Sequence, residues 1–315
     1  MVLPAVAGPF DLGTVVVRQA LHIDPYTAQV DVVSDPLPHI LKGIPLRVRR
    51  IRVVLDRSHF TLNPTSCRPE SVTGALASTQ GTKANVASPF KLVGCSRLSF
   101  KPSLTIGLSG AGRTRSGDHP TLTSVLTQPQ HEANLLAAKV RLPLALALDP
   151  HNSQHVCPYK VAKKVRSGRV HCPASTIVGS ASAVTPLLSR PLHGKVYFVQ
   201  GIRFVHGHPI HTLPTLLVPL RGQIALDLTA ETSVAGSGAL VTTFPAIPDA
   251  PVSRFTLTIS GGRKGVLVIT GNHLDICRKQ QFAHSALGAQ NGKSRHRRIK
   301  VATPCGKAIA QRSGA

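Results

Sequence analysis

Three histidines lie within six residues of one another, at His206, His208 and His211. In a strand, His206 and His208 would point to the same face, about 6.5–7 Å apart along the chain. That spacing suits shared coordination of a transition metal, for which imidazole nitrogen is a common ligand, and His193 or His273 could supply a fourth ligand. The alternative is a polar loop, because the chain has 15 histidines in all.

Serines and carboxylates, the common nucleophiles and acid–base groups, stand outside catalytic motifs. Ser109 and Ser237 are flanked by glycine but lack the Gly-x-Ser-x-Gly spacing of a nucleophile elbow. Asp35, Asp149 and Asp249 each have a proline as neighbour, which favours turn initiation over catalysis. The glycine-rich segment around Ser109 lacks the Gly-Lys-Ser/Thr ending of a phosphate-binding loop. The sequence therefore predicts no enzyme and no cofactor, and a hydrolase is only the third functional candidate.

Positive charge dominates the composition, because 37 Lys and Arg against 13 Asp and Glu give a formal net charge of +24. Such a charge favours polyanionic partners: nucleic acid, an anionic cell-envelope polymer or an acidic membrane surface. The clusters of basic residues are Arg47, Arg49, Arg50 and Arg52; Lys160, Lys163, Lys164, Arg166 and Arg169; and Lys293, Arg295, Arg297, Arg298 and Lys300.

The third cluster is the best polyanion-binding candidate, because its five charges fall in one expected hairpin. Single-stranded nucleic acid usually also needs aromatic platforms for its bases, and none is interleaved here. A phosphate-rich wall polymer or an acidic lipid surface is therefore the favoured partner, and no small-molecule substrate is indicated. The alternative is a solvated strand edge, where Lys and Arg prevent edge-to-edge aggregation.

Six cysteines fall into three sequential pairs. Four of them form two pairs with 28-residue spacing, and the middle pair is 15 apart. Repeat modules fold locally, so of the fifteen possible connectivities we expect each pair to close its own loop, with Cα atoms about 4.4–6.8 Å apart. A disulfide framework is typical of secreted proteins. The expected bonds are Cys67–Cys95, Cys157–Cys172 and Cys277–Cys305.

Short segments of alternating apolar and polar residues predict the β-strands that must position these residues. In "IPLRVRRIRVVL" at 44–55, the clearest strand, Ile51, Val53 and Leu55 point to one face. Similar segments recur about every 8–12 residues, separated by Gly and Pro, with little sign of helix. The pattern predicts an all-β chain of tandem Ig-like β-sandwich modules with disulfide-stapled hairpins. The sequence has no run of about 18 apolar residues, so it predicts no transmembrane helix.

Equal cysteine spacing also indicates an internal duplication, because the second 28-residue pair lies 210 residues after the first. With a one-residue slip, Gly-Ala-Leu at 74–76 matches Ser-Ala-Leu at 285–287. We expect residues 44–95 and 250–305 to form the same strand–cysteine–hairpin–cysteine unit. The expected domains are a partial first module (1–97), a middle domain with the Cys157–Cys172 loop (98–200), a last module repeating the first (201–305) and a flexible tail (306–315).

Several longer stretches carry a family resemblance. They are "PAVAGPFDLGTVVVRQALHIDPYTAQVDVVSDPLPHILKGIPLRVRRIRVVLDRSHFTLNPTSC", "VTGALASTQGTKANVASPFKLVGC", "CPASTIVGSASAVTPLLSRPLHGKVYFV" and "FPAIPDAPVSRFTLTI". In order and in spacing to the cysteines they resemble a family of large secreted or cell-surface repeat proteins of high-GC actinobacteria. The resemblance covers most of residues 4–305 and implies arrays of β-rich modules behind a signal peptide. It implies no catalytic residues.

The chain differs from that pattern at its start, where the sequence begins within a module and shows no export signal. We therefore expect a fragment of a longer protein, exported by a signal peptide encoded upstream. The leading functional hypothesis is a non-enzymatic extracellular or cell-surface protein with a structural or adhesive role. The alternative is a polyanion-binding module that uses the basic clusters.

Overall fold

The computed structural model shows an all-β chain, with 52% of residues in strands and 5% in helices. It divides into two compact units, the first comprising Met1–Asp24 and Ala28–Asn63 and the second comprising Pro25–Thr27 and Pro64–Ala315. No helix among the described residues is long and apolar enough to cross a membrane. The described residues are 2–46, 62–163, 170–271 and 274–305.

The described residues of the first unit form three two-stranded antiparallel hairpins. Leu12 and Val17 are buried, whereas other apolar side chains such as Phe10, Val16 and Leu21 are more than 60% exposed. These strands therefore bury few of their apolar side chains. The hairpins pair β1 (Val2–Ala7) with β2 (Phe10–Val16), β3 (Gln19–Ile23) with β4 (Val30–Ser34), and β5 (Ile40–Leu41) with β6 (Ile44–Pro45).

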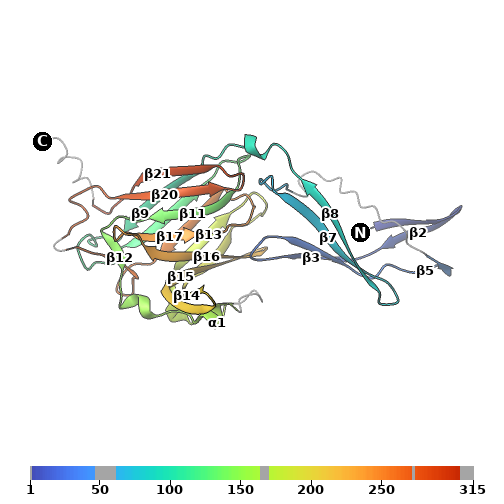
Figure 1. Cartoon of the computed structure of the whole chain (residues 1–315), viewed down its shortest axis with the longest axis horizontal. Helices are drawn as coiled ribbons and strands as arrows, with labels where there is room; N and C mark the ends of the chain where they lie inside the picture. The colour runs from blue at the N-terminus through green and yellow to red at the C-terminus, as the bar shows by residue number, and fades with distance from the viewer. Residues whose placement is uncertain (1, 47–61, 164–169, 272–273, 306–315) are drawn as a thin grey trace. The chain divides into compact units, whose positions relative to one another are not determined.

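The second unit is built on one sheet of 11 antiparallel strands (Figure 1). In order across the sheet they are β21 (Ser294–Lys300), β20 (Phe282–Ala289), β11 (Leu135–Arg141), β17 (Leu240–Phe244), β16 (Ala225–Val234), β15 (His208–Arg221), β14 (Leu192–Val205), β13 (Ile177–Val184), β18 (Arg254–Ile259), β10 (Thr121–Thr127) and β9 (Ser103–Ser109).

The two edges of this sheet meet. Beyond the end of β21, Ala302 forms a parallel bridge with Gly107 of β9. The Leu108 amide donates to the Ala302 carbonyl at 2.7 Å, and the Ala302 amide donates to the Ile106 carbonyl at 3.0 Å. The sheet thus closes on itself, and alternate residues of its strands point inward, where they form a main apolar core and a smaller cluster around Leu126 and Leu135.

Strands from the predicted middle and last modules alternate in this sheet, as where β11 lies beside β20 and β13 lies beside β18. The predicted boundary between residues 200 and 201 falls inside β14. The structure therefore joins these two segments in one unit, because the apolar faces of their strands are buried against each other. The all-β class is confirmed, whereas tandem Ig-like sandwich modules are not.

The remaining elements of the second unit are short or peripheral. A small sheet pairs β12 (Leu146–Leu148) with β19 (Leu267–Ile269). Helix α1 (Tyr159–Ala162) lies inside the Cys157–Cys172 loop. A further hairpin pairs β7 (Pro69–Ala77) with β8 (Lys83–Lys91).

All three predicted disulfides are confirmed, and no described cysteine is free. Their Cα–Cα distances fall within the predicted range. The distances are 5.6 Å for Cys67–Cys95, 5.3 Å for Cys157–Cys172 and 5.4 Å for Cys277–Cys305.

The two 28-residue disulfide loops enclose matching hairpins, β7–β8 and β20–β21. Each hairpin turns through five residues, 78–82 in one and 289–293 in the other. In both turns the first amide donates to the fifth carbonyl at 2.8 Å, and the glycine amide donates back to the first carbonyl at 3.0 Å. Both glycines, Gly81 and Gly292, have positive φ, of 83° and 84°. The turns therefore correspond with the one-residue slip seen in the sequence.

The two hairpins differ in how deeply their side chains are buried. Leu76 on β7 is 54% exposed, whereas Leu287 at the matching place on β20 is 3% exposed. The strand expected before Cys67 falls on residues 47–61, outside the described residues, so the full duplication stays a prediction.

The Cys277–Cys305 bond stabilises the segment that closes the sheet, because Ala302 lies three residues before Cys305 and both cysteines pack against the core. We expect the double variant Cys277→Ser/Cys305→Ser to lose about 3–4 kcal/mol of unfolding free energy, the chain-entropy value for a loop of this size. Urea denaturation followed by circular dichroism measures this. A loss below about 1 kcal/mol would show that the bond does not constrain the closing segment.

Candidate polyanion-binding face

Strands β21, β20 and β11 align basic side chains on the outer face of the closed sheet. In one row across the strands, Arg298 pairs with His284 and His284 pairs with Arg141. In the next row, His296 and Lys139 lie on either side of Ala286. Residues two apart on a strand share a face, so both rows and Lys300 point the same way. The basic face comprises Lys139, Arg141, His284, His296, Arg298 and Lys300, all of them exposed.

The electrostatic surroundings of the basic face favour an anionic ligand. A shallow hollow of about 460 Å³ lies among its side chains. The guanidinium carbon of Arg298 lies 3.6 Å from the centre of the Phe282 ring, which orients this side chain. The nearest acidic residue along these rows is Glu231, separated from Lys139 by Thr243 of strand β17. The face therefore presents several cations with no carboxylate between them.

The predicted third cluster is only partly on this face. Arg298 and Lys300 belong to it, whereas strand alternation points Arg295 and Arg297 to the opposite side of β21. Lys293 lies in the turn, where its ammonium donates to the Leu98 carbonyl at 2.7 Å. The five residues therefore do not all share one face of the strand, although Arg297 also borders the hollow, and binding by the whole cluster stays a prediction.

Sequence reasoning missed four members of the basic face: Lys139, Arg141, His284 and His296. Lys139 and Arg141 show the two-residue spacing of a strand face, which was a usable signal. Their pairing with β20 spans about 145 residues of sequence, however, and no local pattern encodes it.

The other two basic clusters do not add to the face in the described residues. The cluster at 47–52 lies outside the described residues, as do Lys164, Arg166 and Arg169 of the second. In helix α1, Lys160 is exposed, and the Lys163 ammonium just after it lies 5.9 Å from the centre of the Tyr159 ring.

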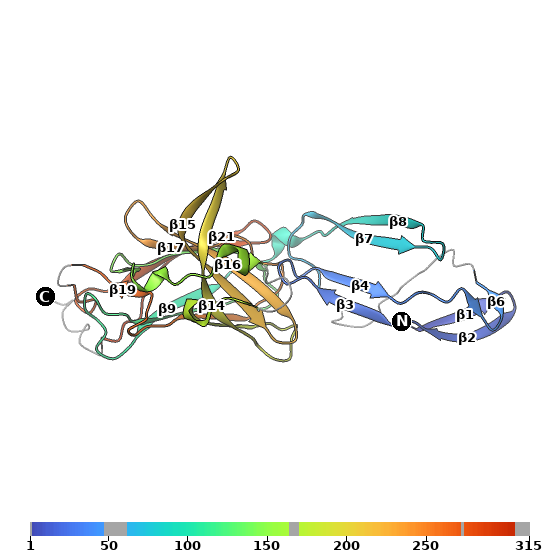
Figure 2. The same cartoon turned by 90° about the horizontal axis from the view of Figure 1, so that it is seen from below.

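The histidine cluster lies at the far end of the long β14–β15 hairpin (Figure 2). His206 and Gly207 form its two-residue turn, and both have positive φ, at 48° and 82°, as in a type I′ turn. His206 therefore does not share a strand with His208, and His211, three residues further along β15, points to the opposite face from His208. Among the described residues no group of three His, Cys, Asp or Glu side chains is arranged to hold a metal ion. His273 lies outside that set, and His193 is exposed on β14.

Asp249 is a structural anchor. One carboxylate oxygen accepts hydrogen bonds from the Thr65 and Ser66 amides, at 2.8 and 3.0 Å. The other accepts from the Thr65 hydroxyl and the Asn134 side-chain amide, each at 2.8 Å. The carboxylate thus joins the β17–β18 loop to the segment before Cys67 and to the segment before β11.

Asp149 has a comparable role at another loop. The His119 ring donates from Nε2 to its carboxylate at 2.6 Å, and the other oxygen accepts from the His151 and Asn152 amides. The hydrogen bond from His119, supported by the two amides and opposed by burial, lowers the pKa of Asp149 below its ordinary value. Both aspartates hold loops, in agreement with their expected place in turns.

Comparison with models of known protein families, with curated proteins and with solved structures finds no match to this chain.

Replacing Asp249 with Ala leaves the Thr65 and Ser66 amides and the Asn134 side chain without their acceptor. Because hydrogen bonds to a charged group are strong and partly buried donors are costly to strand, we expect a loss of about 2–4 kcal/mol of unfolding free energy, measured by urea denaturation. Asp118→Ala is the control, since among the described residues this carboxylate accepts one exposed local bond, from the Arg115 amide. Equal losses in the two variants would contradict the anchoring role.

The lowered pKa of Asp149 makes its contribution to stability depend on pH. Its ionised form is favoured in the folded state, so the contribution is present above the unfolded-state pKa of about 3.9 and is lost as pH falls through the lowered folded pKa. Asp149→Asn should therefore be less stable than wild type at pH 6, with the difference shrinking by pH 3. Urea denaturation at both pH values measures this, and a difference independent of pH would contradict it.

Proposed function

We propose that this chain is a non-enzymatic extracellular or cell-surface protein whose second unit attaches to polyanions through the basic face of β11, β20 and β21. The observation that carries the proposal is the alignment of six basic side chains on one face with no carboxylate between them. The formal net charge of +24 adds long-range attraction of the same sign.

The geometry of the basic face suits a flexible polymer of phosphates. Neighbouring strands lie about 4.8 Å apart and co-facial residues of one strand about 6.5–7 Å apart, so the charges form a close grid. Arg141 and Arg298 can each form paired hydrogen bonds with phosphate oxygens, while Lys139 and Lys300 act as point charges. The partner we favour is a phosphate-rich cell-envelope polymer.

Nucleic acid is a less favoured partner, because base recognition needs open aromatic platforms. The aromatic ring beside the basic face is Phe282, and Arg298 stacks on it. The face therefore offers cationic contacts to phosphates. Among the described residues it offers no open aromatic ring on which bases could stack.

An extracellular location is supported by the disulfides. All six cysteines of the chain are paired, as is common in oxidising compartments. A second candidate function is a purely structural or adhesive role in a repeat protein, as in the family the sequence resembles. The equal 28-residue spacing of the Cys67–Cys95 and Cys277–Cys305 bonds favours it, since equivalent disulfide loops are expected of repeated modules.

The basic face can be tested with inorganic polyphosphate as the probe. We expect Lys139→Gln/Arg141→Gln/Arg298→Gln to weaken binding at least tenfold and to reduce the slope of log K against log salt by about 2–3, one for each lost phosphate contact. Binding is measured by fluorescence anisotropy of labelled polyphosphate between 50 and 300 mM salt, where affinity of the wild type should fall steeply.

The control removes the same number of charges elsewhere, in exposed loops, as Arg190→Gln/Arg263→Gln/Lys264→Gln. This variant should change the affinity less than threefold. Equal losses in both triple variants would indicate non-specific attraction by net charge, and salt-independent binding would contradict the proposal. Tighter binding to a single-stranded oligonucleotide than to polyphosphate would favour nucleic acid as the partner instead.

A further inference from the structure

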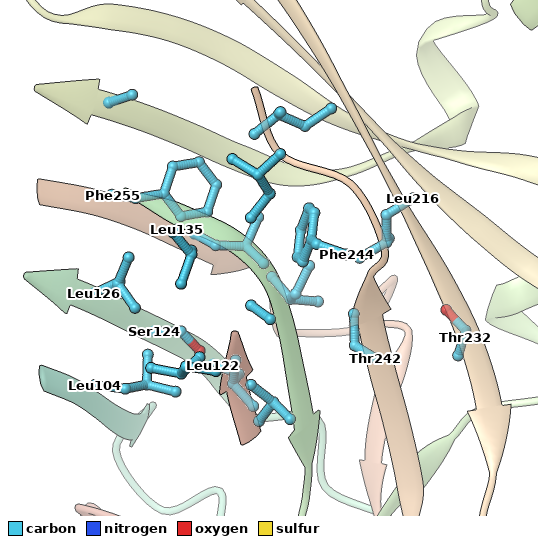
Figure 3. Close-up of a pocket in the computed structure, with 18 of the residues that line it drawn as sticks. Leu104, Leu122, Ser124, Leu126, Leu135, Leu216, Thr232, Thr242, Phe244 and Phe255 are labelled. Atoms are coloured by element: carbon cyan, nitrogen blue, oxygen red, sulfur yellow. The ribbon is translucent and has the colours of Figure 1, made fainter. Parts of the chain in front are cut away.

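The inner face of the closed sheet in the second unit lines a partly open apolar cavity of about 150 Å³ (Figure 3). Its wall includes side chains from both halves of the sheet, such as Leu126 of β10 and Leu216 of β15. Phe244 and Phe255 meet in this wall edge to face, with ring centres 6.3 Å apart. The cavity is thus a feature of the closed sheet as a whole.

The side chains on the inner face explain why space remains there. A sheet of about eight strands closes on an interior that side chains just fill, and more strands enclose a wider one. This sheet has 11 strands, yet aromatic residues are only 4% of the chain and Trp is missing altogether. At Ala138 and Ala183 the inner face carries no more than a methyl group.

The chemistry of the wall is apolar with three hydroxyls. No Asp, Glu, Lys, Arg or His side chain is among the residues that line the cavity. Thr232 and Thr242 face each other across β16 and β17, and Ser124 lies on β10, apart from them (Figure 3). None of the three hydroxyls bonds to another described group, so each is available to a ligand.

We infer that this cavity binds a small neutral molecule that is mainly hydrocarbon and carries one hydroxyl group. An apolar cavity of about this volume, lined by Leu, Ile and Phe, stays dry and accepts benzene or xenon in another protein. The paired Thr232 and Thr242 hydroxyls provide the place for the polar group of the ligand. A charged ligand is rejected, because nothing in the wall compensates for its lost hydration. This site is separate from the basic face on the outer side of the same strands.

The β17–β18 loop, which contains Asp249, forms part of the cavity wall. Ile247, Pro248 and Ala250 of the β17–β18 loop line the cavity, and Asp249 between them holds the loop in place through its bonds to Thr65 and Asn134. This part of the cavity wall is therefore held in place by hydrogen bonds.

Binding can be tested with benzene, phenol and benzoate as probes, followed by NMR of the Leu and Val methyl groups and by thermal unfolding. Benzene and phenol should shift the methyl signals of the lining residues and raise the melting temperature, since a ligand of the folded state stabilises it. Benzoate should leave those methyl signals in place. Thr242→Val should weaken phenol about fivefold, the value of one hydrogen bond, and leave benzene unchanged.

The matched variants are Ala138→Leu, which fills the cavity, and Ala286→Leu, which places the same side chain on the outer face of the neighbouring strand. Ala138→Leu should weaken benzene binding at least tenfold, whereas Ala286→Leu should change it less than twofold. Equal binding by both variants, or no response of the lining methyl groups to benzene and phenol, would overturn the inference.

If Ala138→Leu does not fold, xenon pressure on the wild-type protein provides the test. Methyl shifts confined to the lining residues support the site. Shifts confined to other residues, or no shifts at all, overturn it.

Discussion

Two backbone hydrogen bonds between β9 and Ala302 close the sheet, and the arrangement of the rest of the second unit depends on this closure. They join the edges of an 11-stranded sheet, which then has no long open edge to pair with other chains. Closure also gives every strand one face toward the interior of the sheet and one face toward its outer side. Aliphatic side chains on the inside form the main core. On the outside, Val199 and Leu217 form a small apolar cluster beside helix α1, and β11, β20 and β21 carry charged groups. The basic face and the apolar cavity are both consequences of this closure.

Local patterns in the sequence were enough to predict the all-β class and the three disulfides. Alternation identified the all-β class, and the cysteine spacing identified three local pairs. Separate modules are not confirmed, because strand pairing is non-local: β11 lies between β20 and β17, each separated from it by about a hundred residues or more. Neither the closure at Ala302 nor the row Arg298–His284–Arg141 could be derived from one-dimensional periodicity.

A comparison of the hairpins β7–β8 and β20–β21 distinguishes what the local sequence determines from what the neighbouring strands determine. Their turns share the same hydrogen bonds and the same glycine conformation, because five residues with glycine in the fourth position specify that turn wherever it occurs. Their burial differs, because burial depends on which strands lie alongside. Leu287 has the closed sheet around it, whereas Leu76 on β7 is largely exposed. Similar sequence therefore predicts similar local structure without predicting the same packing.

The basic face and the cavity constrain each other through strand register. On β11, Lys139 and Arg141 point outward while Ala138 and Val140 point toward the cavity. A shift of one residue in the pairing of β11 would bury the two cations and expose the two apolar side chains. The cost of burying unpaired cations in an aliphatic interior is large, so the charges on the outer face help to specify the register that leaves the cavity apolar. The same alternation thus defines both sites, and neither can change by a strand slip without the loss of the other.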